Sequence, residues 1–195
     1  MAKAALIVVD VQRDFCEGGA LAAAGRASLL TPLKKCIHAA RQAGAVIVYT
    51  RDWHPANHSS FKPNGGPWPV HCVADTEGAE LMPPLRARAN DLMIHKGVGA
   101  HGAGYSGFEG TGLHEQLKNL GVSRIAVSGI ATEYCVRATA LDGLKAGFET
   151  FLLTDMIRAV EADATPGVLA ELGRAGARGI SAREWLRRYE RRQAR

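Results

Sequence analysis

The chain alternates short continuous apolar runs with longer segments of helical spacing. Five runs predict strands that are buried on both faces, and a sixth predicts a weaker one: AALIVVDV, AVIVYT, DLMIHK, RIAVSG, ETFLLT and ARGIS. Apolar residues recur with helical spacing at residues 26–43, 111–120, 133–145, 166–173 and 182–192. Strands that alternate with helices predict a parallel sheet with helices on both faces, so we expect a three-layer α/β fold with six strands.

The size and apolar content favour a single domain over residues 1–195. The chain has 195 residues, of which 47% are hydrophobic, and this is enough for a full core. No apolar run reaches the ~18 residues of a membrane-spanning helix, and the start MAKAALIVVD lacks the features of a signal peptide. We therefore expect a cytoplasmic protein with no membrane partner.

The positive charge is concentrated at the C-terminus. The last thirteen residues, REWLRRYERRQAR, hold six arginines against two glutamates and so carry +4 of the net charge of +5. A nucleic-acid-binding protein would spread its basic residues over one face, so no nucleic-acid partner is expected. For residues 182–195 the pattern favours a solvated, arginine-rich helix.

Two long segments interrupt the alternation, and polar residues cluster after the strands. Residues 51–90 and 95–112 are rich in Gly, Pro, His and aromatic residues, and loops of this length in a compact domain are usually functional. Each segment follows a strand. Parallel α/β sheets bind ligands at the carboxyl ends of their strands, so this edge is the expected site.

Two familiar motifs are excluded. GVGAHG matches the glycine spacing of a dinucleotide-binding turn, but the sequence that follows, AGYSGFEGTG, does not begin a helix. The four cysteines form no CxxC pair, which excludes zinc-ribbon and thioredoxin sites. Without an export signal, disulfides are not expected.

The first long segment predicts a metal site. TRDWHPANHSSF carries Asp52, His54 and His58, and WPVHC adds His71. Imidazole and carboxylate groups bind divalent metals such as zinc, iron or manganese. Loop histidines in ordinary hydrogen bonds are the alternative, but three histidines and an aspartate in one short stretch favour a metal. The absence of thiolates favours an open catalytic site over a closed structural one.

A second group centres on Cys135, which lies where a strand passes into a helix in SGIATEYCVRATA. A helix N-terminus favours the thiolate, which is the nucleophilic form of cysteine. Asp10 and Lys96 also stand at strand ends, where each could be an ordinary N-cap or a solvated charge. Beside a thiol, Lys96 would hold the thiolate and Asp10 would move protons. The set of three at one edge is the stronger signal.

Five blocks together resemble a known family. They are VVDVQRDFCEGGAL, TRDWHPANHSSF, GPWPVHC, HKGVGAHGAGYSGFEGTGL and VSGIATEYCVRATALDGLKAGF. In order and spacing they are similar to the nicotinamidase/pyrazinamidase branch of the isochorismatase-like cysteine hydrolases. The resemblance covers about residues 4–165. It implies a Rossmann-like fold and hydrolysis of a small amide to an acid and ammonia.

The resemblance also implies residue roles. Cys135 would be the nucleophile, Asp10 would take its proton and pass it to ammonia, and Lys96 would stabilise the ionised pair. The family has a cis peptide where this chain has Ile130–Ala131, and the N–H groups of Ala131 and Cys135 would form the oxyanion hole.

The resemblance assigns one divalent metal to Asp52, His54 and His71, with zinc as the first choice and iron or manganese as alternatives. The ring of the substrate would sit among a set of apolar and aromatic side chains: Phe15, Leu21, Trp68 and Tyr105. His58 stays open as a further ligand. Tyr134 stands where some relatives have His, which leaves its contact with substrate open.

Alternative functions remain. The nearest is another cysteine amidase of the family that acts on a carbamoyl or ureido compound, and the metal-loop motifs argue against it. Isochorismate hydrolysis uses no cysteine, so Cys135 argues against that activity. A non-catalytic binding protein is disfavoured by the intact triad. The partner expected is a small amide, and the sequence leaves a homo-oligomer open.

Overall fold

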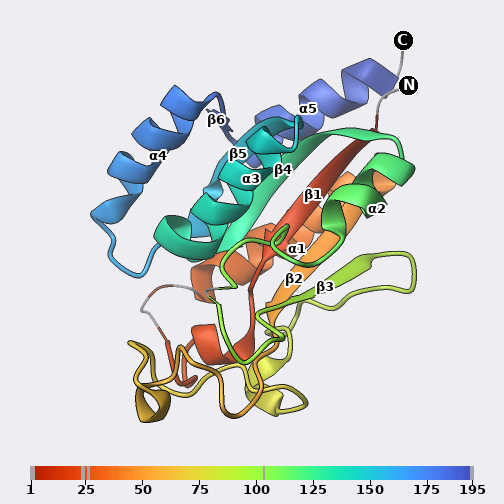
Figure 1. Ribbon diagram of the computed structural model, residues 1–195. Coiled ribbons are helices and arrows are strands. Elements are labelled where there is room, and N and C mark those ends of the chain that lie inside the picture. The colour runs from red at the N-terminus through yellow and green to blue at the C-terminus, as the bar shows by residue number, and fades with distance from the viewer. Residues whose placement is uncertain (1–2, 23–24, 26, 103, 194–195) are drawn as a thin grey trace.

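A single parallel sheet forms the centre of the molecule (Figure 1). The computed structural model describes residues 3–22, 25, 27–102 and 104–193. The strands are β1 (Lys3–Val9), β2 (Val46–Asp52), β3 (Leu92–Lys96), β4 (Val122–Ile130), β5 (Glu149–Arg158) and β6 (Arg178–Ile180). They lie in the order β3-β2-β1-β4-β5-β6, and every neighbouring pair is parallel. The predicted fold class is confirmed.

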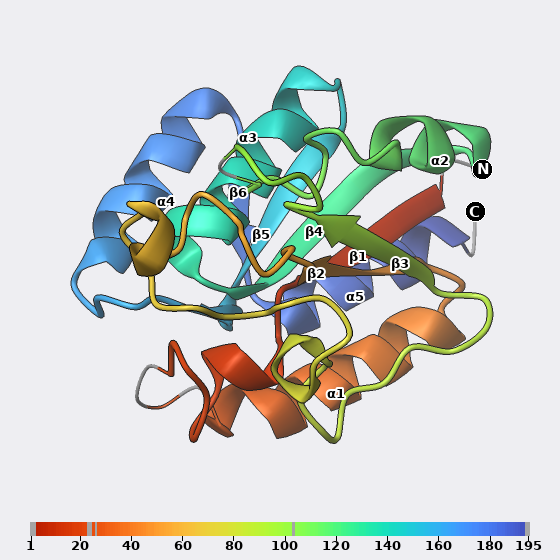
Figure 2. The same ribbon diagram turned by 60° about the horizontal axis from the view of Figure 1, so that its bottom comes forward.

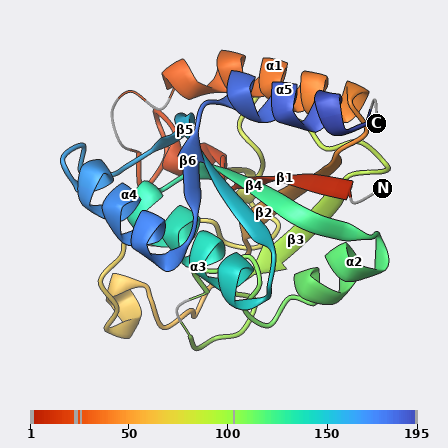
Figure 3. The same ribbon diagram turned by 90° about the horizontal axis from the view of Figure 1, so that it is seen from above.

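Helices cover both faces of the sheet (Figure 3). One face carries α1 (Ala27–Gln42) and α5 (Ala182–Gln193), which lie side by side. The other carries α2 (Leu113–Asn119), α3 (Arg137–Lys145) and α4 (Ala164–Ala175). Since the strands bury both faces, β1 is fully apolar from Ala4 to Val9, as its continuous run predicts.

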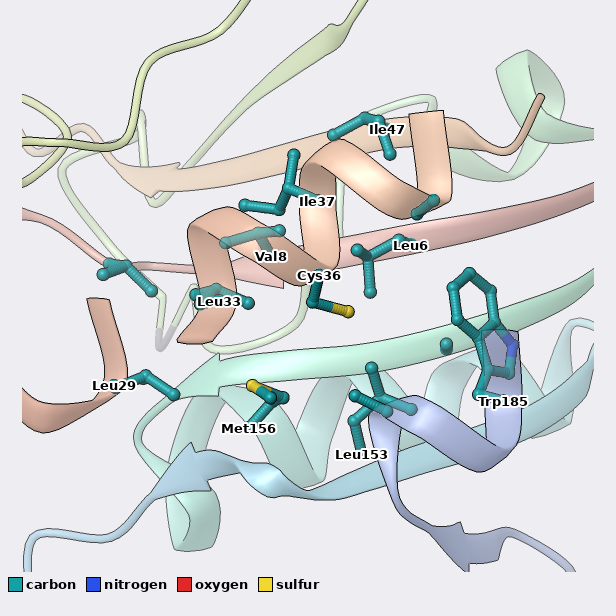
Figure 4. Packing of buried hydrophobic residues seen from close by; sticks show 14 of the residues in the cluster. Leu6, Val8, Leu29, Leu33, Cys36, Ile37, Ile47, Leu153, Met156 and Trp185 are labelled. Carbon is teal, nitrogen blue, oxygen red and sulfur yellow. The ribbon is translucent and has the colours of Figure 1, made fainter. Parts of the chain in front are cut away.

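One face of the C-terminal helix α5 packs into the core. Trp185 and Tyr189 of α5 are buried, and their parallel rings lie 6.0 Å apart. Figure 4 shows Trp185 in the same cluster as Leu33 and Ile37 of α1. Burying an aromatic or aliphatic side chain of this size contributes roughly 1.5–3 kcal/mol. The expectation of a solvated helix therefore holds only for the outer side of α5, while residues 194–195 lie outside the described residues.

β5 is four residues longer than the run ETFLLT predicts. Its pairing with β4 shifts between Val127, which pairs with Leu152, and Gly129, which pairs with Ile157. Residues 153–156 of β5 lie between these two pairs and form a bulge, in which Thr154 and Asp155 are exposed. The apolar pattern therefore breaks in the sequence although the strand continues to Arg158.

The order of the strands places a switch point between β1 and β4. The chain leaves the centre through β1, β2 and β3, returns to β4, and then moves outward in the other direction. Open α/β sheets bind ligands at such a point, outside the carboxyl ends of the strands. Figures 1 and 2 show the long connecting segments gathered at that end. Within the described residues, no helix is long and apolar enough to cross a membrane.

Candidate active site

Four consecutive strands deliver polar side chains to the switch point. Asp10 follows β1, Asp52 ends β2, Lys96 ends β3, and Cys135 lies in the turn after β4. All four side chains are buried. The parallel register pairs Asp52 directly with Lys96. The placement at one edge of the sheet agrees with the prediction made from the strand ends.

Lys96 is the centre of this group. Its Nζ lies 2.8 Å from Asp10 Oδ2 and donates to Asp52 Oδ1 at 2.5 Å and to Cys135 Sγ at 3.4 Å. It also donates to the carbonyl of Gly104 at 2.8 Å. Burial works against the ammonium, but the two carboxylates outweigh it and raise the pKa of Lys96 well above its usual value. Lys96 is therefore a permanent buried cation.

Asp10 is held in position to accept a proton. Its backbone is in the left-handed region (φ 47°), and Thr50 Oγ1 donates to Oδ1 at 2.6 Å. Oδ2 faces Lys96 but receives no hydrogen bond of good geometry. Burial, together with the charge of Asp52, raises the pKa of Asp10 despite the attraction of Lys96. A carboxylate with a raised pKa and a free acceptor oxygen is suited to general base work.

Cys135 differs from the expectation of a resting thiolate. Burial raises the pKa of its thiol well above the usual value; Lys96 opposes this shift, and the charges of Asp10 and Asp52 add to it. A helix N-terminus alone would favour the thiolate, but these two carboxylates and the burial of the side chain outweigh it. The free thiol is therefore protonated, and its proton must leave as attack occurs. Carboxylate oxygens of Asp10 and Asp52 and the sulfur all lie within 4.8 Å of one another.

The turn before the thiol has an unusual backbone. The Ile130–Ala131 peptide bond is cis. Thr132–Val136 then forms a turn of π-helix, and α3 begins at Arg137. The sequence predicts a continuous helix from residue 133, so the π-turn is a correction: the Val136 N–H donates to the carbonyl of Ala131, five residues back, and Cys135 lies within this wider turn.

Three side chains form a candidate metal site. Ligand atoms of Asp52, His54 and His71 all lie within 4.8 Å of one another, and the three side chains are buried. His54 Nδ1 is 2.9 Å from the carbonyl of Gly97, and His71 Nδ1 is 2.7 Å from the carbonyl of Pro69. Each Nδ1 must therefore carry the proton, which leaves each Nε2 free as a metal ligand. The donor set fits a divalent cation.

The electrostatics of the histidines agree with this fit. Burial lowers the pKa of His71, so its ring is neutral, as a metal ligand must be. Burial opposes a charge on His54 as well, but Asp52, whose Oδ2 lies 3.6 Å from His54 Nε2, raises the pKa of His54. A cation held by His54 Nε2 and Asp52 would take the place of that proton.

His58 lies beside this group. Its ring stacks on His54 with centroids 4.1 Å apart, and burial next to His54 lowers the pKa of His58 to about 4. Its Nε2 is buried without a hydrogen-bond partner. The three-ligand group does not include it. An orphaned buried nitrogen costs free energy, and His58 therefore remains an open candidate for contact with the metal shell.

A cavity of about 220 Å³ joins the two groups. Cys135, Ile130 and Ala131 (the thiol end) and Asp52 and His71 (the ligand end) all line it, and a carboxylate oxygen of Asp52 lies within 4.8 Å of Cys135 Sγ. The four residues assigned to the ring by resemblance all line it: Phe15, Leu21, Trp68 and Tyr105. Tyr134 also lines it, and its ring packs edge-on against Trp68 at 5.3 Å. The lining thus combines aromatic and aliphatic side chains with the polar groups of Asp52, His71 and Cys135.

Sequence reasoning missed several supporting residues. Buried Gln12 donates to the carbonyl of Asp52 at 2.8 Å and accepts from its N–H at 2.8 Å, which clamps the end of β2. Val160, after β5, lines the cavity. A polar residue just after a strand is a signal that could have drawn attention to Gln12. No pattern in the sequence marks Val160.

The fold and site define a Rossmann-like α/β protein with a buried Asp–Lys–Cys cluster beside a candidate metal centre. The family model for the Isochorismatase domain matches residues 4–184. The chain therefore belongs to the isochorismatase family, as the sequence blocks indicate.

Relatives within the family are more specific. The chain is 42% identical over 176 residues to the nicotinamidase/pyrazinamidase of Mycobacterium tuberculosis, covering 86% of this chain and 93% of the relative. The structure of Pyrococcus horikoshii pyrazinamidase in complex with zinc superposes with a TM-score of 0.89 at 44% identity, covering 92% of this chain and 99% of the other. A nicotinate complex of an L. infantum protein gives 0.82 at 35% identity, with 93% of each chain covered.

Proposed function

We propose that this chain is a nicotinamidase, which hydrolyses nicotinamide to nicotinate and ammonia and also accepts pyrazinamide. The observation that carries the proposal is the shape of the cavity. A thiol, a base and a buried cation meet beside a cavity that aromatic side chains line, and a metal-ligand group that shares Asp52 with them lies next to it. A flat ring with a carboxamide on one side and a nitrogen on the other matches both ends.

In the proposed reaction, Cys135 attacks the carboxamide carbon. Asp10 Oδ2 takes the thiol proton while the new C–S bond forms, and Lys96 offsets the charge on Asp10. The N–H groups of Ala131 and Cys135 stabilise the oxyanion, and each such donor is worth roughly 3 kcal/mol. Asp10 then passes its proton to the departing amine, and ammonia leaves. Water cleaves the thioester, which releases nicotinate and restores the thiol.

One divalent ion would be held by Asp52, His54 and His71, and we propose zinc, with iron or manganese as alternatives. When bound, the ion offers an open position to the lone pair of the ring nitrogen. Phe15, Leu21, Trp68 and Tyr105 would position the ring, since aromatic contacts add about 1 kcal/mol beyond burial. We also propose that residues 1–195 act as one hydrolase domain in the cytoplasm.

Ammonia release from three amides tests this function. With purified, metal-loaded protein at equal substrate concentrations, nicotinamide and pyrazinamide should be cleaved. Benzamide should be much poorer because it lacks the ring nitrogen. Equal rates on benzamide and nicotinamide would remove the role of the metal in binding the ring.

A ureido and a carbamoyl compound complete the panel. Those compounds are the substrates expected for the rival cysteine amidases of the family. Activity on one of them, with none on nicotinamide, would transfer the chain to that class and would contradict the proposed function.

A further inference from the structure

The carboxylate of Glu133 joins two walls of the cavity. Its Oε1 accepts hydrogen bonds from the backbone N–H groups of Val160 at 2.8 Å and Glu161 at 2.9 Å. Its second oxygen, Oε2, is buried without a hydrogen-bond partner. A carboxylate that accepts two backbone N–H groups makes charge-assisted bonds, which are about twice as strong as neutral ones.

The two ends of this connection both belong to the cavity. Glu133 lies in the π-turn between Ala131 and Cys135, two residues that line the cavity. Val160 lies in the segment that leads from β5 to α4, and its side chain also lines the cavity. Val160 is 41% exposed, which is high for an apolar side chain in such a position. The wall that it forms is thus at the open side of the cavity.

The π-turn and the segment that carries Val160 differ in how many other hydrogen bonds hold them in place. The π-turn is fixed by its own bonds, because the N–H groups of Tyr134 and Val136 both donate to the carbonyl of Ala131 at 3.1 Å. Residues 159–163, by contrast, are tied to α4 by the Ala164 N–H, which donates to the carbonyl of Glu161 at 3.0 Å, and to the cavity wall that carries Cys135 by the two bonds to Glu133. Loss of the Glu133 carboxylate would therefore release Val160 more than Cys135.

We propose that Glu133 is a positioning residue for substrate binding, which acts by holding Val160 against the ring of the bound amide. The proposal rests on the proposed function for the identity of that amide. Glu133 contacts no reacting atom in this scheme. Its effect should fall on the affinity for substrate and leave the chemical step nearly unchanged.

Three single variants test the connection through the kinetics of nicotinamide hydrolysis. Glu133→Ala should raise KM about tenfold and leave kcat within about twofold, the size expected for two lost hydrogen bonds. Glu133→Gln should recover most of the affinity because its amide oxygen still accepts. Asp163→Ala is the matched control, since it removes an exposed carboxylate from the same segment that makes no capping bond. A fall in kcat with KM unchanged would overturn the proposal.

A double variant shows whether the effect passes through Val160. If it does, adding Glu133→Ala to Val160→Ala should raise KM little beyond the value for Val160→Ala alone. Fully additive effects would show that Glu133 acts by another route and would contradict the proposal.

Amide hydrogen exchange separates this proposal from the proposed function. In Glu133→Ala, the amides of Val160 and Glu161 should exchange at least about tenfold faster than in the wild type, while the Asp163→Ala control should not change them. Unchanged exchange would overturn the connection even if the enzyme cleaves nicotinamide. Faster exchange in a protein without nicotinamidase activity would keep the connection and refute the substrate.

Discussion

The two ends of the cavity are built in different ways. At the thiol end, Asp10, Lys96 and Cys135 come from three strands whose relative heights are fixed by the ladders of the sheet. At the ligand end, His54 and His71 belong to a long loop, and backbone carbonyls of other loop residues orient their rings. Asp52 is the exception, because it ends β2 and yet belongs to both groups.

This difference separates chemistry from recognition. The thiol end can shift only if the sheet shifts, and a sheet buried on both faces is costly to distort. The ligand end depends on loop geometry, so it can change without disturbing the strands. Because Asp52 also accepts from Lys96, a change of this residue at the ligand end reaches the thiol end directly.

The largest effect is expected at the thiol. Cys135→Ala should lower kcat by at least about a thousandfold, because the covalent route is lost, and should leave the fold intact. The measurement is steady-state ammonia release together with the thermal unfolding midpoint. Cys36→Ala is the control, since Cys36 is a buried residue of α1 and burial raises the pKa of its thiol to about 12. Inactivation by a thiol reagent that labels Cys72 alone would contradict the assignment of the nucleophile.

The second prediction rests on the place of Asp52 in both the metal-ligand group and the group around the thiol. Both Asp52→Asn and His71→Ala should lower metal content, measured by elemental analysis, and raise KM about tenfold or more. Only Asp52→Asn should also lower kcat strongly, since Lys96 loses a charged partner. A full metal complement in the double variant Asp52→Ala/His71→Ala would remove the metal site.

The third prediction disturbs the ligand end without touching a ligand. A Cβ at Gly97 would lie 2.4 Å from His54 Cε1, and the backbone there is left-handed (φ +61°). Gly97→Ala should therefore tilt His54 and weaken metal binding about tenfold, with kcat near wild type once metal is saturating. Gly99→Ala is the matched control, because its nearest contact would be an ordinary 3.6 Å. Equal metal affinity in the two variants would show that the position of His54 does not set the affinity.

The smallest effect is expected at His58. His58→Ala should change metal content less than His71→Ala, because His58 lies outside the three-ligand group. A metal titration of both variants under the same conditions provides the comparison. A loss in His58→Ala that equals the loss in His71→Ala would make His58 a full ligand.

Most of the fold follows from the apolar runs, and the departures have local causes. The strands of the sequence and those of the structure agree except where the bulge in β5 exposes Thr154 and Asp155 within a strand. The π-turn before α3 is the second departure, since helical spacing in the sequence does not distinguish it from an α-helix.

The residues of the candidate site could be predicted from the sequence, but the hydrogen bonds and ion pairs among them could not. Strand ends and a familiar motif order are enough to find Lys96 and Cys135. They do not show that Lys96 meets two carboxylates, or that burial keeps the thiol protonated. Gln12 and Glu133 were missed for a related reason: each acts on backbone groups far away in the sequence, and such a contact leaves no local pattern.

The three tryptophans lie in three different environments, so their intrinsic fluorescence can report on separate parts of the molecule. Trp68 forms part of the cavity wall, with its indole N–H donating to Tyr105 Oη at 3.3 Å. Trp185 of α5 is buried in the core, and Trp53 lies beneath the guanidinium of Arg51. Intrinsic fluorescence during a ligand titration should therefore follow Trp68, and emission during heating should follow Trp185. A Trp68→Phe variant should lose the fluorescence change on ligand binding and keep the Trp185 emission that follows unfolding.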